Sequence, residues 1–187
     1  ARQKVYLEMI LNESTRLKAM INNILEYSQR DEAPAFKYSI EESDLSGLLA
    51  DILAEMKYWF EVRKIKLTTQ ILEGVRVDMD KERIRQVLEN LVSNAIKFTP
   101  ELGEVTIRLF NEGTHHMIEI EDTGYGIPED QISKIFDRFY RVGGTETEGI
   151  SGTGLGLTVV KEIIDAHAWR IEVKSKLGEG SIFSILI

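Results

Sequence analysis

An aspartate followed by two glycines is the first place in this sequence where side chains could bind a ligand. The stretch "IEIEDTGYGIP" alternates like a strand and then carries Asp122, Gly124 and Gly126. The alternation puts Asp122 on the side of the isoleucines, so its carboxylate is expected at the rim of the buried face. A carboxylate there needs hydrogen-bond donors, and the exocyclic amine of a purine would be one. Glycines would let the chain pass close to a planar ring, although turns of this composition also occur without ligands.

A second candidate is a polar stripe on the predicted helix "DKERIRQVLENLVSNAIKF", which begins at Asp80 and runs to about Phe98. At about 100° per residue, Asn90, Asn94 and Lys97 line up beside the apolar face of this helix. Asn is a modest helix former, and ordinary packing does not require two of them on one side of a helix. The stripe therefore indicates a binding surface, with a merely solvated helix face as the alternative.

A third candidate is the segment "SGTGLGLTVVKEI", which places Gly152, Gly154 and Gly156 at the start of a predicted helix. The free backbone N–H groups and the dipole at such a helix start favour an anion such as phosphate. A dinucleotide-binding fingerprint does not fit, because Leu157 stands where its third glycine belongs and a polar loop precedes it. The Walker A pattern does not fit either, because no Gly-Lys-Ser or Gly-Lys-Thr follows the loop.

These residues must be positioned by helices that alternate with strand pairs. Gly113 separates two alternating segments into a hairpin, and "SDL" at Ser43 is typical of a capped helix start. This order predicts a two-layer α/β sandwich rather than a doubly wound parallel sheet. The predicted strands are residues 36–41, 65–71, 75–78, 105–110, 117–122, 169–174 and 181–187; the predicted helices are residues 43–62, 80–98 and 155–167; a polar loop covers residues 142–152.

The N-terminal segment predicts a separate helix with a coiled-coil-like seam. Its apolar residues recur at steps of three and four. The next segment, "RDEAPAF", is polar and cannot bury this seam, so we expect a partner helix or a second copy of the protein to cover it. Packing on the main domain is the alternative. The seam residues are Leu7, Ile10, Leu11, Leu17, Met20, Ile21, Ile24 and Tyr27.

Length and composition narrow the class of protein. The chain has 187 residues, which suits one core-bearing domain with an additional element. A net charge of -8 argues against non-specific nucleic-acid binding. The absence of cysteine excludes disulfides and thiolate chemistry and fits a reducing compartment. No apolar run reaches the length of a membrane span, and the start at Ala1 without Met suggests a fragment whose missing part could carry an anchor.

Four segments in order resemble the N, G1, F and G2 boxes of the sensor histidine kinases of two-component systems. They are "NLVSNAIKF", "DTGYGIP", "FDRFYRV" and "GTGLGL", and the resemblance covers about residues 37–187. This family belongs to the ATP-binding superfamily that also holds gyrase, the Hsp90 chaperones and MutL. The resemblance implies the Bergerat-type fold, in which helices cover one face of a mixed sheet. "LNESTRLKAMINNILEYSQ" also resembles the second helix of the family's dimerisation and phosphotransfer hairpin, which implies a hairpin part at 1–30, a linker at 31–36 and a catalytic domain at 37–187.

The resemblance implies a site for Mg²⁺ and ATP and gives each matching residue a role. Asp122 would accept a hydrogen bond from the adenine amino group, and Ser181 would support Asp122 through water. Asn90 and Asn94 would bind Mg²⁺ and the phosphates through their amide oxygens. Arg141 would reach the γ-phosphate, and residues 142–152 would form a mobile lid. Further contacts with the nucleotide would come from Lys97, Phe98, Gly124, Gly126, Ile127, Gly152, Thr153, Gly154, Leu155, Gly156 and Leu157.

The implied reaction transfers the γ-phosphoryl group to a histidine, which then supplies an aspartate of a response regulator. In hydrolytic relatives a glutamate matches Asn90, and an amide cannot act as a general base, so attack by water should be slow. The family's acceptor histidine lies on a hairpin helix that this chain lacks, so we expect nucleotide binding without autophosphorylation. The implied protein is a homodimer with a cytoplasmic catalytic part. The alternatives are a serine kinase or anti-sigma factor of the same superfamily, or an ATP-binding scaffold without chemistry.

Two further expectations concern residues that depart from the family pattern. None of His115, His116 and His167 replaces the acceptor histidine, and a structural role is expected for His167 at a helix C-terminus. Ala168 and Trp169 stand where the family usually has two glycines, which leaves the geometry of that helix end open.

Overall fold

The computed structural model describes residues 38–143, 150 and 152–187. The chain divides into two units, residues 1–38 and Ser39–Ile187, and the second holds all helices and strands named below. The predicted hairpin helix at 1–30, its seam and the linker at 31–36 lie outside the described residues, as does most of the predicted lid. No helix within the described ranges is long and apolar enough to span a membrane.

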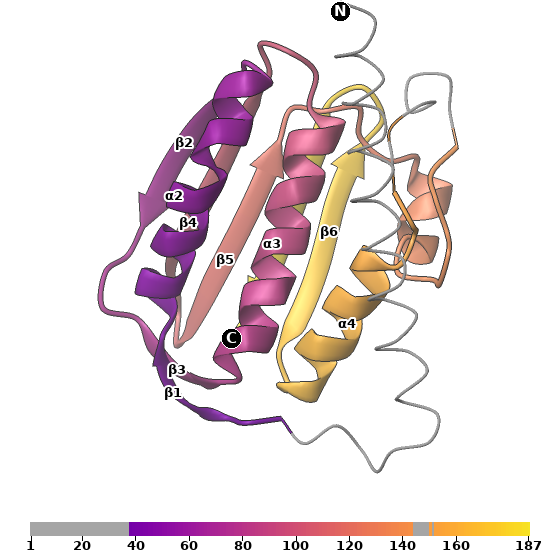
Figure 1. Ribbon diagram of the computed structural model, residues 1–187. Coiled ribbons are helices and arrows are strands. Elements are labelled where there is room, and N and C mark those ends of the chain that lie inside the picture. The colour runs from indigo at the N-terminus through magenta and orange to yellow at the C-terminus, as the bar shows by residue number, and fades with distance from the viewer. Residues whose placement is uncertain (1–37, 144–149, 151) are drawn as a thin grey trace, which may run out of the picture. The chain divides into compact units, whose positions relative to one another are not determined.

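A mixed five-stranded sheet forms one layer of the second unit (Figure 1). In spatial order its strands are β2 (Lys66–Ile71), β4 (Glu104–Glu112), β5 (His115–Asp122), β7 (Gly180–Leu186) and β6 (Arg170–Lys176). Strand β2 runs parallel to β4, and the other neighbours are antiparallel. Helices α2 (Leu45–Val62), α3 (Lys81–Phe98) and α4 (Gly156–Ala166) cover one face of the sheet. The predicted two-layer α/β sandwich is therefore confirmed.

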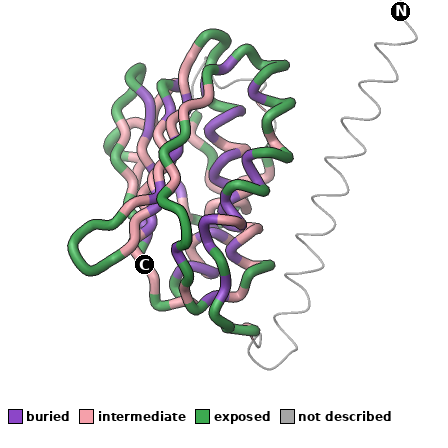
Figure 2. Tube along the Cα trace, turned by 90° about the vertical axis from the view of Figure 1, so that its left-hand side faces the viewer, coloured by how far each residue is buried: buried purple, intermediate pink, exposed green. Residues whose placement is uncertain are grey.

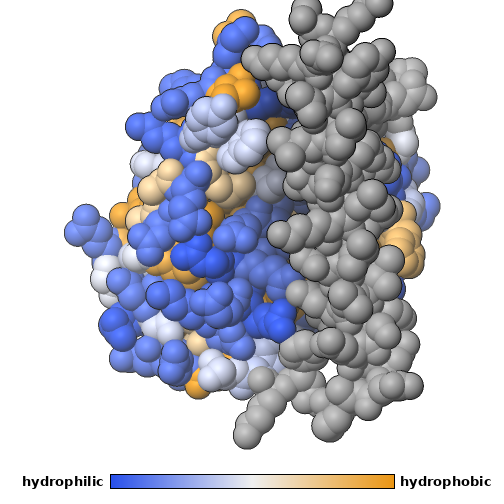
Figure 3. Space-filling view, in the orientation of Figure 1, coloured by the Kyte–Doolittle hydropathy of each residue, from blue (hydrophilic) through white to orange (hydrophobic). Residues whose placement is uncertain are grey.

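The core lies between the sheet and the helices, as the buried segments in Figure 2 show. Along β4 every second residue is buried, beginning with Val105 and Ile107, and β5 alternates in the same way at Ile118 and Ile120. Helix α3 supplies apolar residues at helical spacing, among them the fully buried Leu88. Removal of this apolar surface from water is the main term that favours folding. The part of this helical face that is left uncovered in Figure 3 presents mostly hydrophilic residues.

Side chains at both ends fix the position of α3. The carboxylate of Asp80 accepts a hydrogen bond from the backbone N–H of Arg83 at 3.1 Å, which caps the first turn. At the other end the hydroxyl of Thr99 donates to the carbonyl of Ala95 at 2.6 Å. Pro100 follows and cannot continue the helix. These contacts set the limits of α3, while its buried apolar face packs the helix against the sheet and leaves the stripe that starts at Asn90 beside that face.

The predicted strand at residues 36–41 is wrong in its position. Strand β1 covers Glu41–Asp44 and pairs with β3 (Arg76–Met79) in a separate two-stranded sheet. The aromatic and apolar alternation before Glu41 resembles a strand, but the register with β3 extends only from Glu41 to Asp44. Asp44 then ends the strand because its side chain caps α2 through the N–H of Gly47 at 2.9 Å.

A short 3-10 helix, η1 (Glu129–Lys134), follows Pro128 and was not predicted. Six residues are too few for a periodic apolar pattern, and no side chain caps the start of η1.

Candidate functional site

Asp122 is a buried carboxylate at the end of β5, directly opposite Ser181 of β7. Its Oδ1 accepts a hydrogen bond from the backbone N–H of Gly124 at 2.8 Å. Burial raises the pKa of the Asp122 carboxyl to about 6; backbone hydrogen bonds from Gly124 and Ser181 lower it, and the charge of Glu121 raises it. The strand alternation thus placed Asp122 correctly on the buried side. At neutral pH this group is an ionised acceptor in a poorly solvated position.

The two glycines after Asp122 lie against backbone atoms of other elements. A Cβ on Gly124 would stand 2.4 Å from the carbonyl oxygen of Phe98, and one on Gly126 would stand 2.0 Å from that of Lys176. Gly126 also has φ of 69°, a left-handed conformation that favours glycine. Packing within the protein is sufficient reason for both glycines, and their contact with a planar ligand stays a prediction.

The turn after Asp122 is held between the end of α3 and the tip of the β6–β7 hairpin. The N–H of Tyr125 donates to the carbonyl of Phe98 at 3.1 Å, and the N–H of Gly178 donates to the carbonyl of Tyr125 at 2.7 Å. The N–H of Ile127 donates to the hydroxyl of Ser175 at 2.8 Å. The sequence analysis missed Ser175 and Gly178, although "SKLGEGS" spaces a serine and two glycines in front of Ser181.

The middle of α3 meets the start of α4. The side-chain N–H of Asn90 donates to the carbonyl of Gln86 at 2.9 Å, so the amide oxygen Oδ1 faces away from the helix backbone. A Cβ on Gly156 would stand 3.0 Å from this oxygen, which shows how closely α4 begins beside Asn90. Asn94 is half-buried one turn further along the same stripe. The structure thus brings two of the three sequence candidates together.

Lys97 and Phe98 end the stripe at the C-terminus of α3. The Lys97 side chain reaches solvent, yet protein atoms around the ammonium desolvate it and lower its pKa from the ordinary lysine value. The Phe98 ring is 36% exposed, while its carbonyl is occupied by the turn after Asp122. The backbone of Phe98 therefore holds the turn that follows the buried carboxylate, and Lys97 is the residue before Phe98 in the chain.

The glycine-rich segment leads into α4 and is hydrogen-bonded to the segment "FDRFYRV". Gly154 has φ of 72°, and its carbonyl accepts a hydrogen bond from the N–H of Phe139 at 2.9 Å. Thr153 accepts the N–H of Leu155 at 3.3 Å. Among the residues that the structure describes, no side chain caps the first turn of α4, and N–H groups at such a helix start favour an anion.

The remaining predicted site residues lie partly in the core and partly at the surface. Ile127 and Leu157 are partly buried against the core. Arg141 donates to the carbonyl of Ile150 at 2.7 Å, and a Cβ on Gly152 would meet nothing within 4 Å. Residues 144–149 and 151 of the predicted lid lie outside the described residues.

His167 has the structural role that was expected. Its Nε2 accepts the backbone N–H of Asp80 at 3.0 Å, and its Nδ1 donates to the carbonyl of Ile163 at 2.7 Å. The neutral ring therefore joins the start of α3 to the end of α4. Ala168 takes a left-handed φ of 56° in place of a glycine, so the helix end keeps its turn despite the substitution.

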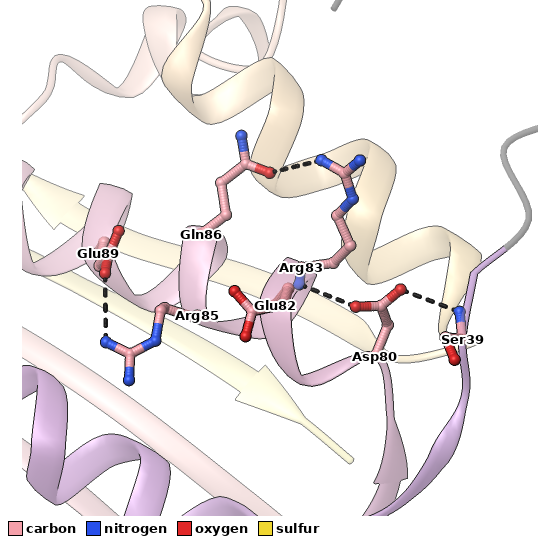
Figure 4. Close-up of a pocket in the computed structure, with 7 residues that line it drawn as sticks. All are labelled: Ser39, Asp80, Glu82, Arg83, Arg85, Gln86 and Glu89. Atoms are coloured by element: carbon pink, nitrogen blue, oxygen red, sulfur yellow. Dashed lines mark hydrogen bonds and ion pairs between the residues drawn. The ribbon is translucent and has the colours of Figure 1, made fainter.

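A shallow hollow on the N-terminal half of α3 is separate from these residues (Figure 4). It lies toward the opposite end of the helix from Phe98. Several of its side chains are bound within the protein: Asp80 accepts the backbone N–H of Ser39 at 3.0 Å, and Arg85 contacts Glu89 at 3.5 Å. We assign no ligand to this hollow. Its lining residues are Ser39, Asp80, Glu82, Arg83, Arg85, Gln86 and Glu89.

Comparison with known proteins identifies relatives of the whole arrangement. The family model "Histidine kinase-, DNA gyrase B-, and HSP90-like ATPase" matches residues 79–187. The circadian input-output histidine kinase CikA of Synechococcus elongatus is 33% identical over 189 residues, which are 100% of this chain and 25% of CikA. The chain therefore spans about a quarter of that relative's length.

Solved structures give the same result. Full-length ShkA in complex with AMPPNP has a TM-score of 0.81 and 26% identity, and the match covers 100% of this chain and 38% of ShkA. Histidine kinase ThkA in complex with response regulator protein TrrA has a TM-score of 0.75 and 30% identity over 97% of this chain and 50% of that chain. The resemblance drawn from the four sequence boxes is confirmed: this chain belongs to the ATPase family of histidine kinases, DNA gyrase B and HSP90.

Proposed function

We propose that this chain binds Mg-ATP among α3, the turn after Asp122 and the start of α4. In the intact protein it would transfer the γ-phosphoryl group to a histidine, from which a response-regulator aspartate takes it. The observation that carries the proposal is the contact of Gly156 with Asn90 on the same helix whose end holds the turn after Asp122. Base, phosphate and metal contacts therefore come from adjoining segments.

Asp122 is suited to bind the base. An ionised carboxylate in a poorly solvated position gains from a donor such as the adenine amino group, because a hydrogen bond to a charged acceptor is stronger than a neutral one. Phe98 offers an exposed ring beside the same turn, which suits a flat nucleoside.

The residues of the α3 stripe fit a magnesium ion. The Asn90 amide nitrogen is used within the helix, so its oxygen is left as a ligand, and Asn94 lies one turn away. Mg²⁺ prefers oxygen ligands and keeps several waters, so two amide oxygens and phosphate oxygens are a plausible set. No group of three His, Cys, Asp or Glu residues in the described part of the chain could hold a metal, which agrees with a site built from amides. Bound Mg²⁺ would neutralise phosphate charge.

The phosphates would lie between Lys97 and the uncapped start of α4. Lys97 supplies a positive charge that the surrounding protein desolvates, which strengthens its attraction for a phosphate. The leading N–H groups of α4 supply donors without a competing side-chain cap. Positioning and charge stabilisation of this kind are the main contributions that a protein makes to phosphoryl transfer.

The site lacks a general base for water at the position of Asn90. Glu89 does not replace it, because its carboxylate points to Arg85 at 3.5 Å on another side of α3. Hydrolysis should therefore be slow, and the nucleotide would survive until a histidine reaches it.

The names and titles of the relatives support the proposed nucleotide and the proposed response-regulator partner. CikA is named a histidine kinase, ShkA was solved with AMPPNP, and ThkA was solved with a response regulator. Homodimerisation is proposed from the apolar seam of the N-terminal segment. The proposal places the reaction in the cytoplasm, the compartment that supplies ATP.

The test is transfer to a separately supplied helical hairpin that bears the acceptor histidine. With γ-labelled Mg-ATP and this chain, acid-labile and base-stable phosphate should form on the histidine. Asn90→Ala should lower the rate about 100-fold. Asn111→Ala is the matched control, because Asn111 lies on β4 and its side chain contacts His116 at 2.7 Å, outside the proposed site. Labelled serine would favour the superfamily serine kinases, and ATP binding without any labelled protein would favour a scaffold.

A further inference from the structure

The hydroxyl of Ser175 lies at the centre of three hydrogen bonds beneath the turn that follows Asp122. It is 2.8 Å from the backbone nitrogen of Ile127, 2.8 Å from the carbonyl oxygen of Gly180 and 2.9 Å from the hydroxyl oxygen of Ser181. These partners belong to two segments: the turn after Asp122 and the first two residues of strand β7. One half-buried side chain thus joins β6 to both sides of the proposed base site.

The protons in this cluster can be assigned, because a serine hydroxyl carries one proton and a carbonyl carries none. The N–H of Ile127 donates to Ser175. Gly180 can only accept, so the proton of Ser175 goes to the Gly180 carbonyl. The contact between the two serines then requires Ser181 to donate to Ser175. This is the one arrangement in which every contact contains a proton.

The assignment decides what Ser181 can offer to a ligand. Its proton is used in the bond to Ser175, so its remaining capacity is that of an acceptor. Ser181 stands directly opposite Asp122 in the β5–β7 register, and its backbone N–H also stabilises the ionised Asp122 carboxylate. The two side chains therefore present only acceptors to a bound base. An amino group satisfies them, whereas a carbonyl in the same place leaves acceptors facing one another.

We propose that Ser175 is a positioning residue for base selection: it holds the Ile127 end of the turn and fixes the Ser181 hydroxyl as an acceptor. The inference rests on the proposed nucleotide site and adds to it a residue that does not touch the nucleotide. Ser175 favours a purine with an amino group at C6 because it uses the Ser181 proton.

The experiment compares two nucleotides on the 187-residue chain. The probes are ATP and purine ribonucleoside triphosphate, which differs from ATP in having hydrogen in place of the C6 amino group. Ser175→Ala should lower the ratio of their affinities about fivefold, because the turn and the Ser181 acceptor lose their support. Ser175→Thr keeps the hydroxyl and should restore the ratio. Ser184→Ala should leave it unchanged, since Ser184 lies on the same hairpin and its hydroxyl contacts Glu119 at 3.5 Å rather than the turn after Asp122.

The ratio of the two affinities distinguishes a role of Ser175 in base selection from a role in stabilising the fold. A well-folded Ser175→Ala variant that weakens both nucleotides equally, or neither, would overturn the inference. If that variant is unfolded, Ser181→Ala takes its place, because it removes the acceptor and keeps the bond from Ile127 to Ser175. An unchanged ratio in Ser181→Ala would also overturn the inference. Wild-type protein that binds neither nucleotide would instead contradict the proposed function itself.

Discussion

At the scale of single residues, Asp122 is subject to opposing effects on its ionisation. Burial raises the pKa of its carboxyl, and two backbone hydrogen bonds oppose the rise without cancelling it. The result, a pKa of about 6, leaves the group mostly ionised at pH 7.5 and mostly protonated at pH 5. The ionised form has an acceptor at every lone pair and the protonated form does not. Affinity for a base that donates a hydrogen bond should follow this titration.

We therefore predict that Asp122→Asn weakens ATP binding at pH 7.5 by about 1.5 to 3 kcal/mol, or roughly 10-fold to 150-fold. In the wild type, affinity should fall as the pH drops through about 6, because protonation removes the charged acceptor. The measurement is calorimetric titration with Mg-ATP between pH 5 and pH 8.

The asparagine variant is also the control for the titration of the nucleotide's own phosphates. Its affinity should change with pH only as those phosphates titrate, so the difference between the two proteins should shrink toward pH 5. Parallel curves, or equal affinity at pH 7.5, would place Asp122 outside the base site.

At the scale of elements, the end of α4 holds Ala168 in a conformation that glycine adopts more easily. The N–H of Ala168 donates to the carbonyl of Asp165 at 3.0 Å, and the N–H of Trp169 donates to that of Ile164 at 3.1 Å, which is the Schellman pattern. Ala168 occupies its left-handed position with φ of 56°. A Cβ is unfavourable there, so the helix end keeps its geometry at a cost in free energy.

Ala168→Gly should raise the free energy of unfolding by about 1 kcal/mol, because glycine takes the left-handed conformation without this penalty. Ala166→Gly is the matched control: Ala166 is also exposed but is the last residue of α4, and glycine there should lower the free energy of unfolding by up to about 0.5 kcal/mol. Urea unfolding of both variants measures the contrast. A loss of stability in both would refute the assigned cost.

Elements with local signals were predictable, and those defined by distant partners were not. The aspartate before α3 and the apolar period of that helix lie within the sequence itself, as does the turn at Gly113. Strand β1 was misplaced because its limits are set by β3, more than thirty residues away. The parallel pairing of β2 with β4 has the same origin.

The site divides in the same way. Asp122, the α3 stripe and the glycine-rich segment were found because each has a spacing that chemistry explains. Ser175 was missed because its importance comes from the hairpin tip folding against a turn 48 residues earlier in the chain. No local pattern of residue types signals such a contact.

At the scale of the whole molecule, α3 and α4 carry the two sides of the proposed site, and two contacts fix their alignment. Gly156 lies against Asn90 at one end of α4, and His167 binds the N–H of Asp80 at the other. The His167 bond joins residues 87 positions apart. It keeps the uncapped start of α4 at a fixed place along α3, so its effect extends to a site that it does not touch.

His167→Ala should lower the free energy of unfolding by about 1 to 3 kcal/mol, because the Asp80 N–H loses its partner and the Ile163 carbonyl keeps only the backbone N–H of residue 167. His115→Ala should change it by less than about 0.5 kcal/mol, since His115 is exposed at the start of β5. Urea unfolding of the two variants measures both values. Equal effects would show that the ring of His167 does not hold the helices together.

The pairing of β5 with β7 also sets an order of events during protein synthesis. Asp122 belongs to an early strand, and its neighbour Ser181 lies in a strand that leaves the ribosome much later. Until Gly180–Leu186 emerges, β5 has β4 on one side and nothing on the other, and Asp122 lacks the backbone donor from Ser181. We therefore expect that nucleotide binding awaits the last strand, and that a chain interrupted before β7 lacks part of the proposed base site.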